Sequence, residues 1–323
     1  MLLFQCQGMQ TFNHHERSIM NIEEFRAIVS NYITEHNEGV TVSNYEATKN
    51  NGIILFGITI NYGGDTVLPT IYLESFFEEY KKGKSIDEIA ERIVLLDKEN
   101  RFAYDIDFSF FSDYEKVKEK LYVKMINTKE NAKLLEVVPY RTFLDLAMVV
   151  YCDVSDICKM EASVLIRNEH IKHFGVSEEE MIDFAYENTR SLGTEIKDLY
   201  NIVENNLIEN DNHITTFVDR GKMFVMTNNR TVFGAVCMSY DDKLDEFISG
   251  RCDGVFIIPS SIHEVILIPN YMITGSTGIE VRKKEGEGIK QIIESVNRNE
   301  LAIEDVLSYN VYYYSSDEGY SIV

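Results

Sequence analysis

The chain contains 323 residues and carries a formal charge of −22 at pH 7, because 53 acidic side chains outnumber 31 basic ones. Hydrophobic residues make up 45% of it and charged residues 26%, a balance that excludes collagen-like, low-complexity and wholly disordered chains. The length predicts two domains or one large one. The excess of acid argues against binding to nucleic acid phosphates or to an anionic membrane, since both attract clustered lysine and arginine.

No apolar run in the sequence approaches the roughly 18 residues that cross a bilayer. The two longest candidates, residues 143–151 and 255–268, are interrupted by Asp145 and by His263-Glu264. The five cysteines are odd in number and widely spaced, in a chain too large to need disulfide cross-links. We therefore expect a reduced, cytoplasmic protein.

Residues 1–19 contain no periodic hydrophobic pattern. We expect either a disordered tail or an untranslated leader read as protein. The second alternative arises because Glu16-Arg17-Ser18 can be encoded as GAA-AGG-AGY, which contains a purine-rich bacterial ribosome-binding sequence shortly before the codon for Met20. Both alternatives place the start of the folded chain at Met20 or Asn21.

Residues 20–111 are expected to form an N-terminal α-β-β-β-α domain. Its first helix follows Asn21, a residue favoured at helix N-caps. The turn Asn50-Asn51-Gly52 tolerates positive φ angles and predicts a tight hairpin. Ser85 with Glu88 has the spacing of a capping box at the start of the last helix. The expected elements are a helix over 22–33, strands over 40–47, 53–62 and 68–73, and helices over 76–80 and 86–94.

Residues 112–323 are expected to form a C-terminal α+β domain, with the boundary inside the aperiodic stretch 101–113. Ser177 and Glu180 form a second capping box. The apolar segment 143–151 fits either a strand or a helix, because short apolar runs do not separate the two. The expected strands are 121–126, 162–166, 223–227, 232–238, 255–258, 265–268 and 311–314, and the expected helices begin at Ser177 or cover 195–207, 241–248 and 289–296.

The sequence thus predicts the α+β class, with mixed helices and mainly antiparallel sheets in two parts. The triplet Tyr312-Tyr313-Tyr314 falls in the last expected strand, where alternate residues face opposite sides of a sheet. Because tyrosine favours strands, we interpret this segment as an ordinary edge strand. The alternative is that one face joins a core while the other presents an adhesive surface.

The densest polar cluster, Ser260-Ser261-Ile262-His263-Glu264, lies between two apolar strands and invites comparison with a nucleophile, a base and an orienting acid. In an extended chain Ser261 and His263 share a face, about 6.6 Å apart, while Glu264 points away. That separation exceeds the reach of general-base catalysis, about 2.6–3.2 Å. We therefore expect local turn structure here, with catalysis by His263 and a partner from elsewhere as the alternative.

Metal and cofactor sites have little support in the sequence. His170 and His173 are three residues apart and could share a helix face with Glu169 or Glu178, but nothing else converges on them. The cysteines lack the short spacing of zinc knuckles. No glycine-rich loop matches a phosphate-binding motif. We expect no cofactor and no native metal.

Several segments resemble a bacterial family, the domain of unknown function 5688 family, and the likeness covers nearly all of residues 20–314. A more distant likeness connects the chain to another uncharacterised family of Gram-positive bacteria. The resemblance implies a bacterial cytoplasmic protein, and it carries no activity and no catalytic residues. The segments that carry it are 69–73 (PTIYL), 80–89 (YKKGKSIDEI), 143–147 (FLDLA), 174–180 (FGVSEEE) and 258–267 (IPSSIHEVIL).

Acidity and abundant aromatic residues favour a non-enzymatic protein-binding or regulatory module, of the adaptor or immunity type, with a basic protein as its partner. The alternative is a small hydrolase or transferase that uses His263 with Ser260 or Ser261, assisted by Cys237. The two hypotheses differ in what surrounds the His263 ring. A cleft with a hydroxyl, thiol or carboxylate in reach favours the enzyme, and a covered ring bonded to backbone favours the binding module.

Overall fold

The computed structural model describes residues 20–63, 68–100, 108–158, 162–199, 223–259, 261–270 and 302–323, together with Glu287 and Lys290. The predicted tail 1–19, Ser260 and, apart from Lys290, the helix predicted over 289–296 lie outside the described residues. The described chain folds as two compact units. The first contains residues 20–49 and 53–100, and the second contains residues 50–52 and the described residues from 108 onward.

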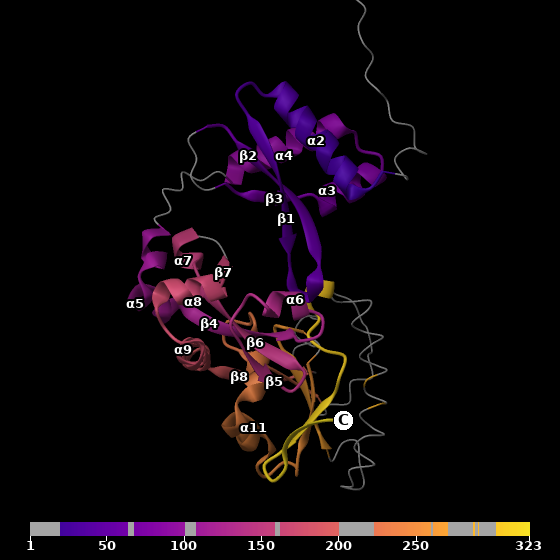
Figure 1. Ribbon diagram of the computed structural model, residues 1–323. Helices are drawn as coiled ribbons and strands as arrows, with labels where there is room; N and C mark the ends of the chain where they lie inside the picture. Colours follow the sequence, from indigo (N-terminus) through magenta and orange to yellow (C-terminus); the bar gives the residue numbers. More distant parts are fainter. Residues whose placement is uncertain are drawn as a thin grey trace, which may run out of the picture. The chain divides into compact units, whose positions relative to one another are not determined.

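The first unit contains a three-stranded antiparallel sheet in the order β1-β2-β3 (Figure 1). The predicted hairpin between β1 and β2 is confirmed, and Asn51 in its turn has a φ of 59°, a left-handed conformation that asparagine tolerates better than most residues. The strands are β1 (Thr41–Thr48), β2 (Ile54–Asn61) and β3 (Thr70–Tyr72).

Three helices pack on this sheet: α2 (Ile22–His36), α3 (Glu74–Lys81) and α4 (Ile86–Asn100). The predicted N-cap of α2 is confirmed, since the Asn21 side chain accepts from the Glu24 backbone at 2.9 Å and the Glu24 carboxylate accepts from the Asn21 backbone at 3.0 Å. The apolar faces of the three helices contact alternate residues of β2, Ile58 and Ile60, in one hydrophobic core. Burial of these faces holds the helices on the sheet.

The second unit contains a four-stranded antiparallel sheet in which β6 pairs with β4, β5 and β7. The apolar segment 143–151 forms strands rather than a helix, with a tight turn at Leu144-Asp145 in which Leu144 has a φ of 54°. Strand β6 is buried on both faces, which explains why its sequence does not alternate. The strands are β4 (Leu121–Asn127), β5 (Tyr140–Phe143), β6 (Leu146–Asp153) and β7 (Ser163–Leu165).

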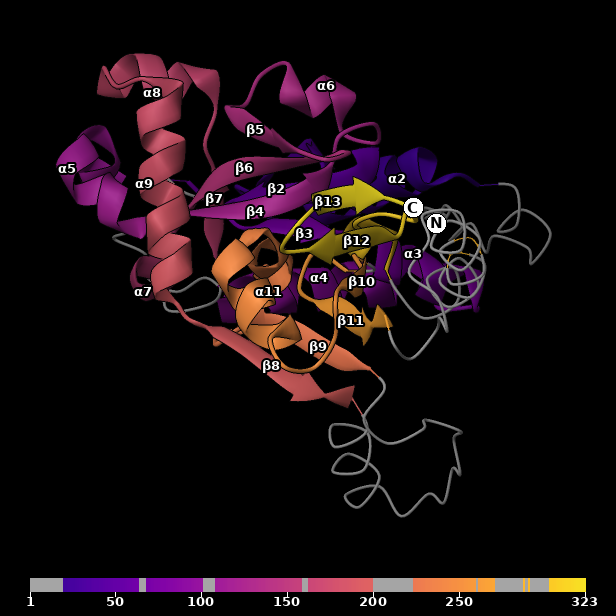
Figure 2. The same cartoon turned by 90° about the horizontal axis from the view of Figure 1, so that it is seen from below.

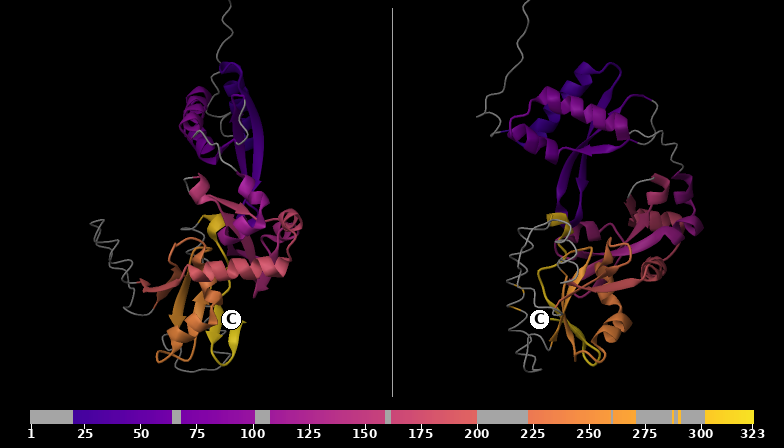
Figure 3. Two further views of the ribbon diagram at one scale, coloured as in Figure 1. Left: turned by 90° about the vertical axis from the view of Figure 1, so that its left-hand side faces the viewer. Right: turned by 180° about the vertical axis from the view of Figure 1, so that it is seen from behind.

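A six-stranded antiparallel sheet completes the second unit, in the order β13-β12-β10-β11-β9-β8 (Figure 2). Figure 3 shows its orange and yellow strands from two further sides. The edge-strand interpretation of the tyrosine triplet is wrong, because β12 lies between β13 and β10. All three tyrosines are buried, Tyr312 and Tyr314 in the main core and Tyr313 on the opposite face. The strands are β8 (Thr194–Asp198), β9 (Phe224–Asn228), β10 (Val255–Ile258), β11 (Val265–Pro269), β12 (Tyr312–Ser315) and β13 (Gly319–Ile322).

Helices of the second unit join and cover these sheets. Helix α9, confirmed with its Ser177 cap, packs on β4, where the Thr189 hydroxyl accepts from the Val123 backbone at 2.8 Å (Figure 2). The α-helices are α5 (Tyr114–Val117), α6 (Ala132–Leu135), α7 (Ser155–Cys158), α8 (Asn168–Phe174), α9 (Glu178–Ser191) and α11 (Asp241–Ile248). The 3₁₀ segments are η1 (Asn50–Gly52), η2 (Phe108–Ser112), η3 (Lys118–Lys120), η4 (Gly234–Ser239) and η6 (Ile303–Asp305).

Two predicted elements are wrong. In the helix predicted over 195–207, residues 195–198 belong to strand β8, because the chain from Thr194 to Asp198 pairs with β9; residues 200–207 lie outside the described residues. The strand predicted over 232–238 is the 3₁₀ segment η4, whose residues are buried between β9 of one sheet and β4 of the other. A short apolar run buried on all sides has no periodicity that separates strand from helix.

The main core of the second unit lies between its two sheets and is closed by α9 and α11. Helices and mainly antiparallel sheets in both units confirm the predicted α+β class. In the part of the chain that the structure describes, no helix combines the length and the apolar character that crossing a bilayer requires.

Tyr312 gives a test of this core. Its hydroxyl donates to Asp145 at 2.5 Å, and the same carboxylate accepts from Ser308 at 3.1 Å and Asn310 at 2.9 Å. We predict that Tyr312→Phe lowers the free energy of unfolding by about 1–2 kcal/mol, because it removes a hydrogen bond to a charged group. Tyr309→Phe, at an exposed tyrosine, is the control. Urea unfolding that gives equal stability for both variants would contradict the prediction.

Candidate functional site

The predicted polar cluster forms a loop between β10 and β11, and the structure gives Ser261 a local role. Ser261 makes an isolated antiparallel bridge with Val306 and is 3% exposed. Its hydroxyl accepts from the backbone N–H of His263 at 3.0 Å. The contact is therefore with the backbone of His263 and not with its imidazole ring.

The His263 ring holds two other segments of the second unit. Its Nδ1 accepts from the backbone N–H of Phe233 at 3.2 Å, and the ring stacks on that of Phe233 at a centroid distance of 5.5 Å and an angle of 13°. Its Nε2 lies 3.5 Å from Asp305 Oδ1. Because Nδ1 is an acceptor, the proton of the neutral ring lies on Nε2, toward Asp305. Among the described side chains His263 thus pairs with Asp305 rather than with Glu264.

In this geometry the imidazole lone pair is occupied by a backbone amide, so no ring nitrogen is left to accept a proton from a hydroxyl. A catalytic role for His263 with Ser261 stays a prediction. Of the two outcomes that separated our hypotheses, the ring is bonded to backbone, as expected for a binding module, and it also has a carboxylate from another segment nearby.

The described cysteines near the core are poor nucleophiles. Burial raises the pKa of Cys237 to about 11, although the Thr194 hydroxyl donates to its sulfur at 3.7 Å. Burial likewise raises the pKa of Cys152 to about 12. Since the thiolate is the reactive form, both residues act as small apolar side chains of the core.

The two histidines weighed as metal ligands lie on α8. The His170 Nδ1 accepts from the backbone N–H of Arg167 at 3.1 Å, and its ring meets Phe111 edge-on at 5.2 Å. Burial, followed by the charge of Arg167, lowers the pKa of His170. In the described ranges no three His, Cys, Asp or Glu side chains are grouped as metal ligands would be. His170 therefore caps a helix start, and His173 remains exposed.

The loop between β9 and η4 is unusually constrained. Thr231 and Phe233 have φ angles of 56° and 54°, which are strained for a β-branched and a bulky residue. The Asn228 side chain spans the loop, accepting from the Arg230 backbone at 3.0 Å and donating to the Val232 carbonyl at 2.9 Å. Sequence reasoning missed this loop because its apolar residues resembled a strand.

This loop and β6 line a pocket of about 630 Å³, which we call the Arg230 pocket. The Arg230 guanidinium donates to Asp153 at 2.8 Å and to the Tyr122 hydroxyl at 3.3 Å, and it lies 4.8 Å above the Tyr122 ring. Burial alone would raise the pKa of Asp153, but hydrogen bonds from Ser155 and the charge of Arg230 lower it below its usual value. The pocket is lined by Tyr151, Asp153, Ser155, Ala162, Ser163, Arg230, Val232 and Phe233.

A second depression, of about 720 Å³, lies on α9, and we call it the acidic α9 groove. The residues that line it include four carboxylates and no basic side chain. Phe184, one of its lining residues, is 37% exposed, and the Lys118 ammonium lies 5.6 Å above the Phe184 ring. The groove is lined by Ser177, Glu179, Glu180, Asp183, Phe184, Glu187 and Asn188.

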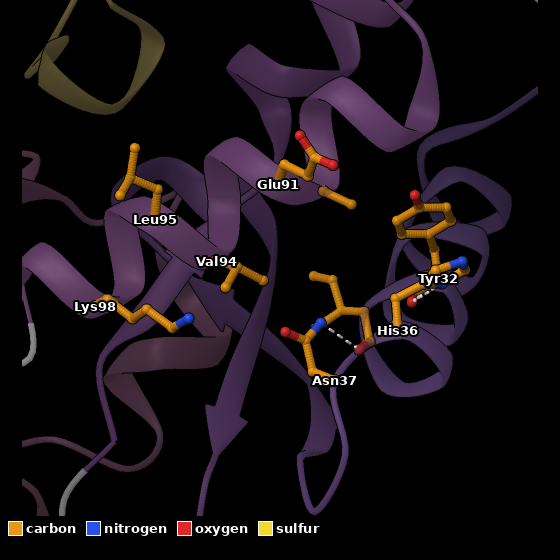
Figure 4. Close-up of a pocket in the computed structure, with 9 residues that line it drawn as sticks. Tyr32, His36, Asn37, Glu91, Val94, Leu95 and Lys98 are labelled. Atoms are coloured by element: carbon orange, nitrogen blue, oxygen red, sulfur yellow. Dashed lines mark hydrogen bonds between the residues drawn. The ribbon is translucent and has the colours of Figure 1, made fainter.

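In the first unit, a groove of about 480 Å³ lies between α2 and α4 (Figure 4). Its apolar residues include Val94 and Leu95, while Glu91 and Lys98 bring charges of both signs. On α2 the His36 ring stacks on Tyr32 at 3.9 Å. The remaining lining residues are Ile33, Asn37 and Ala90.

Two compact α+β units, the second built on two antiparallel sheets, define the class of this chain. It belongs to the family described as a family of unknown function (DUF5688), which matches residues 22–316. Comparisons with curated proteins and with solved structures gave no significant match.

The structural role of His263 can be tested at the backbone amide of Phe233, which donates a hydrogen bond to the imidazole ring. We predict that His263→Ala speeds hydrogen exchange of the Phe233 amide at least about tenfold, because the amide loses its partner and the loop opens more easily. His263→Asn, which can present an oxygen near the position of Nδ1, should show a smaller effect. His173→Ala is the control on an exposed histidine. Unchanged exchange in His263→Ala would show that the ring does not hold the loop.

The lowered pKa of Asp153 predicts a pH dependence. A carboxyl with a depressed folded pKa stabilises above its unfolded pKa, about 3.9, and loses this contribution as pH falls through the folded value. We predict that Asp153→Asn costs about 1 kcal/mol near neutral pH after screening by solvent, and that this difference shrinks in acid. Urea unfolding across the acidic range measures it, and a difference that grows in acid would contradict the assignment.

Proposed function

We propose that this chain is a non-enzymatic protein-binding module, of the adaptor or immunity type, that engages a basic protein segment through the acidic α9 groove. The observation that supports this most is the arrangement of acid on one exposed face of α9 around an accessible aromatic ring. Each part of that arrangement points to the chemistry of the partner.

The acidic spacing on α9 works against the stability of the helix itself. Glu179, Asp183 and Glu187 follow one another at intervals of four residues, and like charges at that spacing destabilise a helix by about 0.2–0.5 kcal/mol per pair. Among these three acids, Asp183 alone has a close ion pair with another described residue, Arg141 at 2.6 Å. Glu179 lies in the first turn, where acid favours the helix, but Asp183 and Glu187 lie beyond it. A basic partner would relieve their repulsion, which supports a binding role for this face.

Phe184 supplies an apolar anchor inside the acid. Exposed aromatic side chains are common at the centres of protein interfaces, where they contribute a large contact area. The Lys118 ammonium already lies over the Phe184 ring, which places a cation against the ring face as a partner's lysine or arginine would be placed. The expected partner segment therefore has basic side chains on both sides of an apolar one.

The charge of the whole chain supports the same choice of partner. A formal charge of −22 attracts basic proteins over long range and accelerates their association at low salt. The groove between α2 and α4 offers charges of both signs, so it is less selective for a basic segment than the α9 groove.

The test is a selection of random displayed peptides on the immobilised full-length chain at low salt. We predict enrichment of peptides that combine lysine or arginine with apolar residues, and affinities that fall as salt rises. Reversing three groove charges, with Glu179→Lys, Glu180→Lys and Glu187→Lys together, should weaken the selected peptides at least about tenfold, since it removes complementary charges and adds repulsive ones. Phe184→Ala should weaken them by a similar factor through loss of the anchor.

The matched control reverses three exposed acids of the first unit, Glu23, Glu35 and Glu38, with the same change in net charge. Equal weakening by both triple variants would mean that only net charge matters and would refute the groove. Selection of acidic or purely apolar peptides would refute the basic partner.

A further inference from the structure

The Arg230 pocket presents one positive and one negative group side by side beneath an apolar wall. Arg230 and Asp153 are 2.8 Å apart, and their side chains remain 44% and 26% exposed. The rest of the lining is mostly apolar or aromatic, with Tyr151, Val232 and Phe233 among its members. Small-molecule sites in proteins typically have this composition, with a few polar groups among apolar walls and a volume of about 300–1,000 Å³.

Both charged groups keep unused hydrogen-bonding capacity. A guanidinium has five N–H donors, and Arg230 directs one to Asp153 and another to Tyr122. Each carboxylate oxygen has two lone pairs, and those of Asp153 accept from Arg230 and from the Ser155 backbone. A ligand can therefore add to the pair without first breaking it.

The aromatic part of the pocket is held in place before any ligand arrives. The centres of the Tyr151 and Phe233 rings lie 5.1 Å apart, and the two rings meet nearly edge-on. The Lys124 ammonium lies 4.6 Å from the centre of the Phe233 ring. His263 stacks on the same ring, and the strained backbone at Thr231 and Phe233 fixes the loop. Rigid walls lower the entropic cost of binding, and backbone strain of this kind gathers at ligand sites.

We propose that the Arg230 pocket binds a free α-amino acid with an apolar or aromatic side chain. The α-carboxylate pairs with the Arg230 guanidinium, the α-ammonium pairs with Asp153, and the side chain lies against Tyr151, Val232 and Phe233. A simple anion would be repelled by Asp153 and a simple cation by Arg230, so the pair selects a ligand that carries both charges. This site is separate from the α9 groove, and neither proposal depends on the other.

Isothermal titration calorimetry on the full-length chain tests the proposal with L-phenylalanine and L-leucine as probes. N-acetyl-L-phenylalanine, which lacks the ammonium, and phenethylamine, which lacks the carboxylate, are the matched ligands. We expect L-phenylalanine to bind saturably, and each matched ligand to bind at least about tenfold more weakly, since each can form only one of the two charge pairs with Arg230 and Asp153. This comparison uses the unaltered chain and so does not depend on any variant folding.

Variants then assign the effect to the pair. Arg230→Met should abolish binding of L-phenylalanine, and Asp153→Asn should remove the preference for the free amine over its N-acetyl form. Arg190→Met is the control, because Arg190 likewise pairs with an aspartate, Asp242 at 2.7 Å, and lies over a tyrosine ring outside this pocket. The proposal is overturned if neither amino acid binds at millimolar concentration, or if the acetylated ligand binds the unaltered chain as tightly as the free one.

Discussion

A close backbone approach at Gly234 organises the second unit. A side chain there would place its first carbon 2.1 Å from the Thr227 hydroxyl and 2.7 Å from the His263 carbonyl oxygen, distances that only glycine permits. This approach brings the end of β9 against the loop between β10 and β11, and it turns the chain into η4 between the two sheets. The left-handed backbone at Phe233, the stacking of His263 and the walls of the Arg230 pocket all follow from that turn.

Periodic and capped elements could be predicted from the sequence, and elements defined by pairing could not. Asn21 and Ser177 begin helices because their side chains satisfy backbone amides only a few residues away, which is local information. Strand β8 depends on its pairing with β9, and β12 is internal because β13, unforeseen in the sequence, covers its far edge. The η4 segment was mistaken for a strand because burial on all sides, and not backbone preference, selected its apolar residues.

The candidate sites also differ in how far they depend on local sequence. The acids of the α9 groove are readable from a single helical stretch, since residues three and four apart share a face. His263 and Phe233 are 30 residues apart in the sequence, and Arg230 and Asp153 are 77 residues apart. The sequence around each residue therefore does not indicate which residue it contacts. The sequence singled out His263 as part of a polar cluster, but the residues that contact its ring are set by tertiary packing.

The polar loop residues Ser261 and His263 hold the backbone of the second unit. Helix α9 presents acidic side chains around Phe184. Both features support the proposed binding function. The most direct test is to titrate the isotope-labelled chain with a selected basic peptide and map the amide chemical-shift changes. Our account predicts that the largest changes lie on α9 at Glu179, Asp183, Phe184 and Glu187. Changes concentrated elsewhere, with those four amides unaffected, would contradict it.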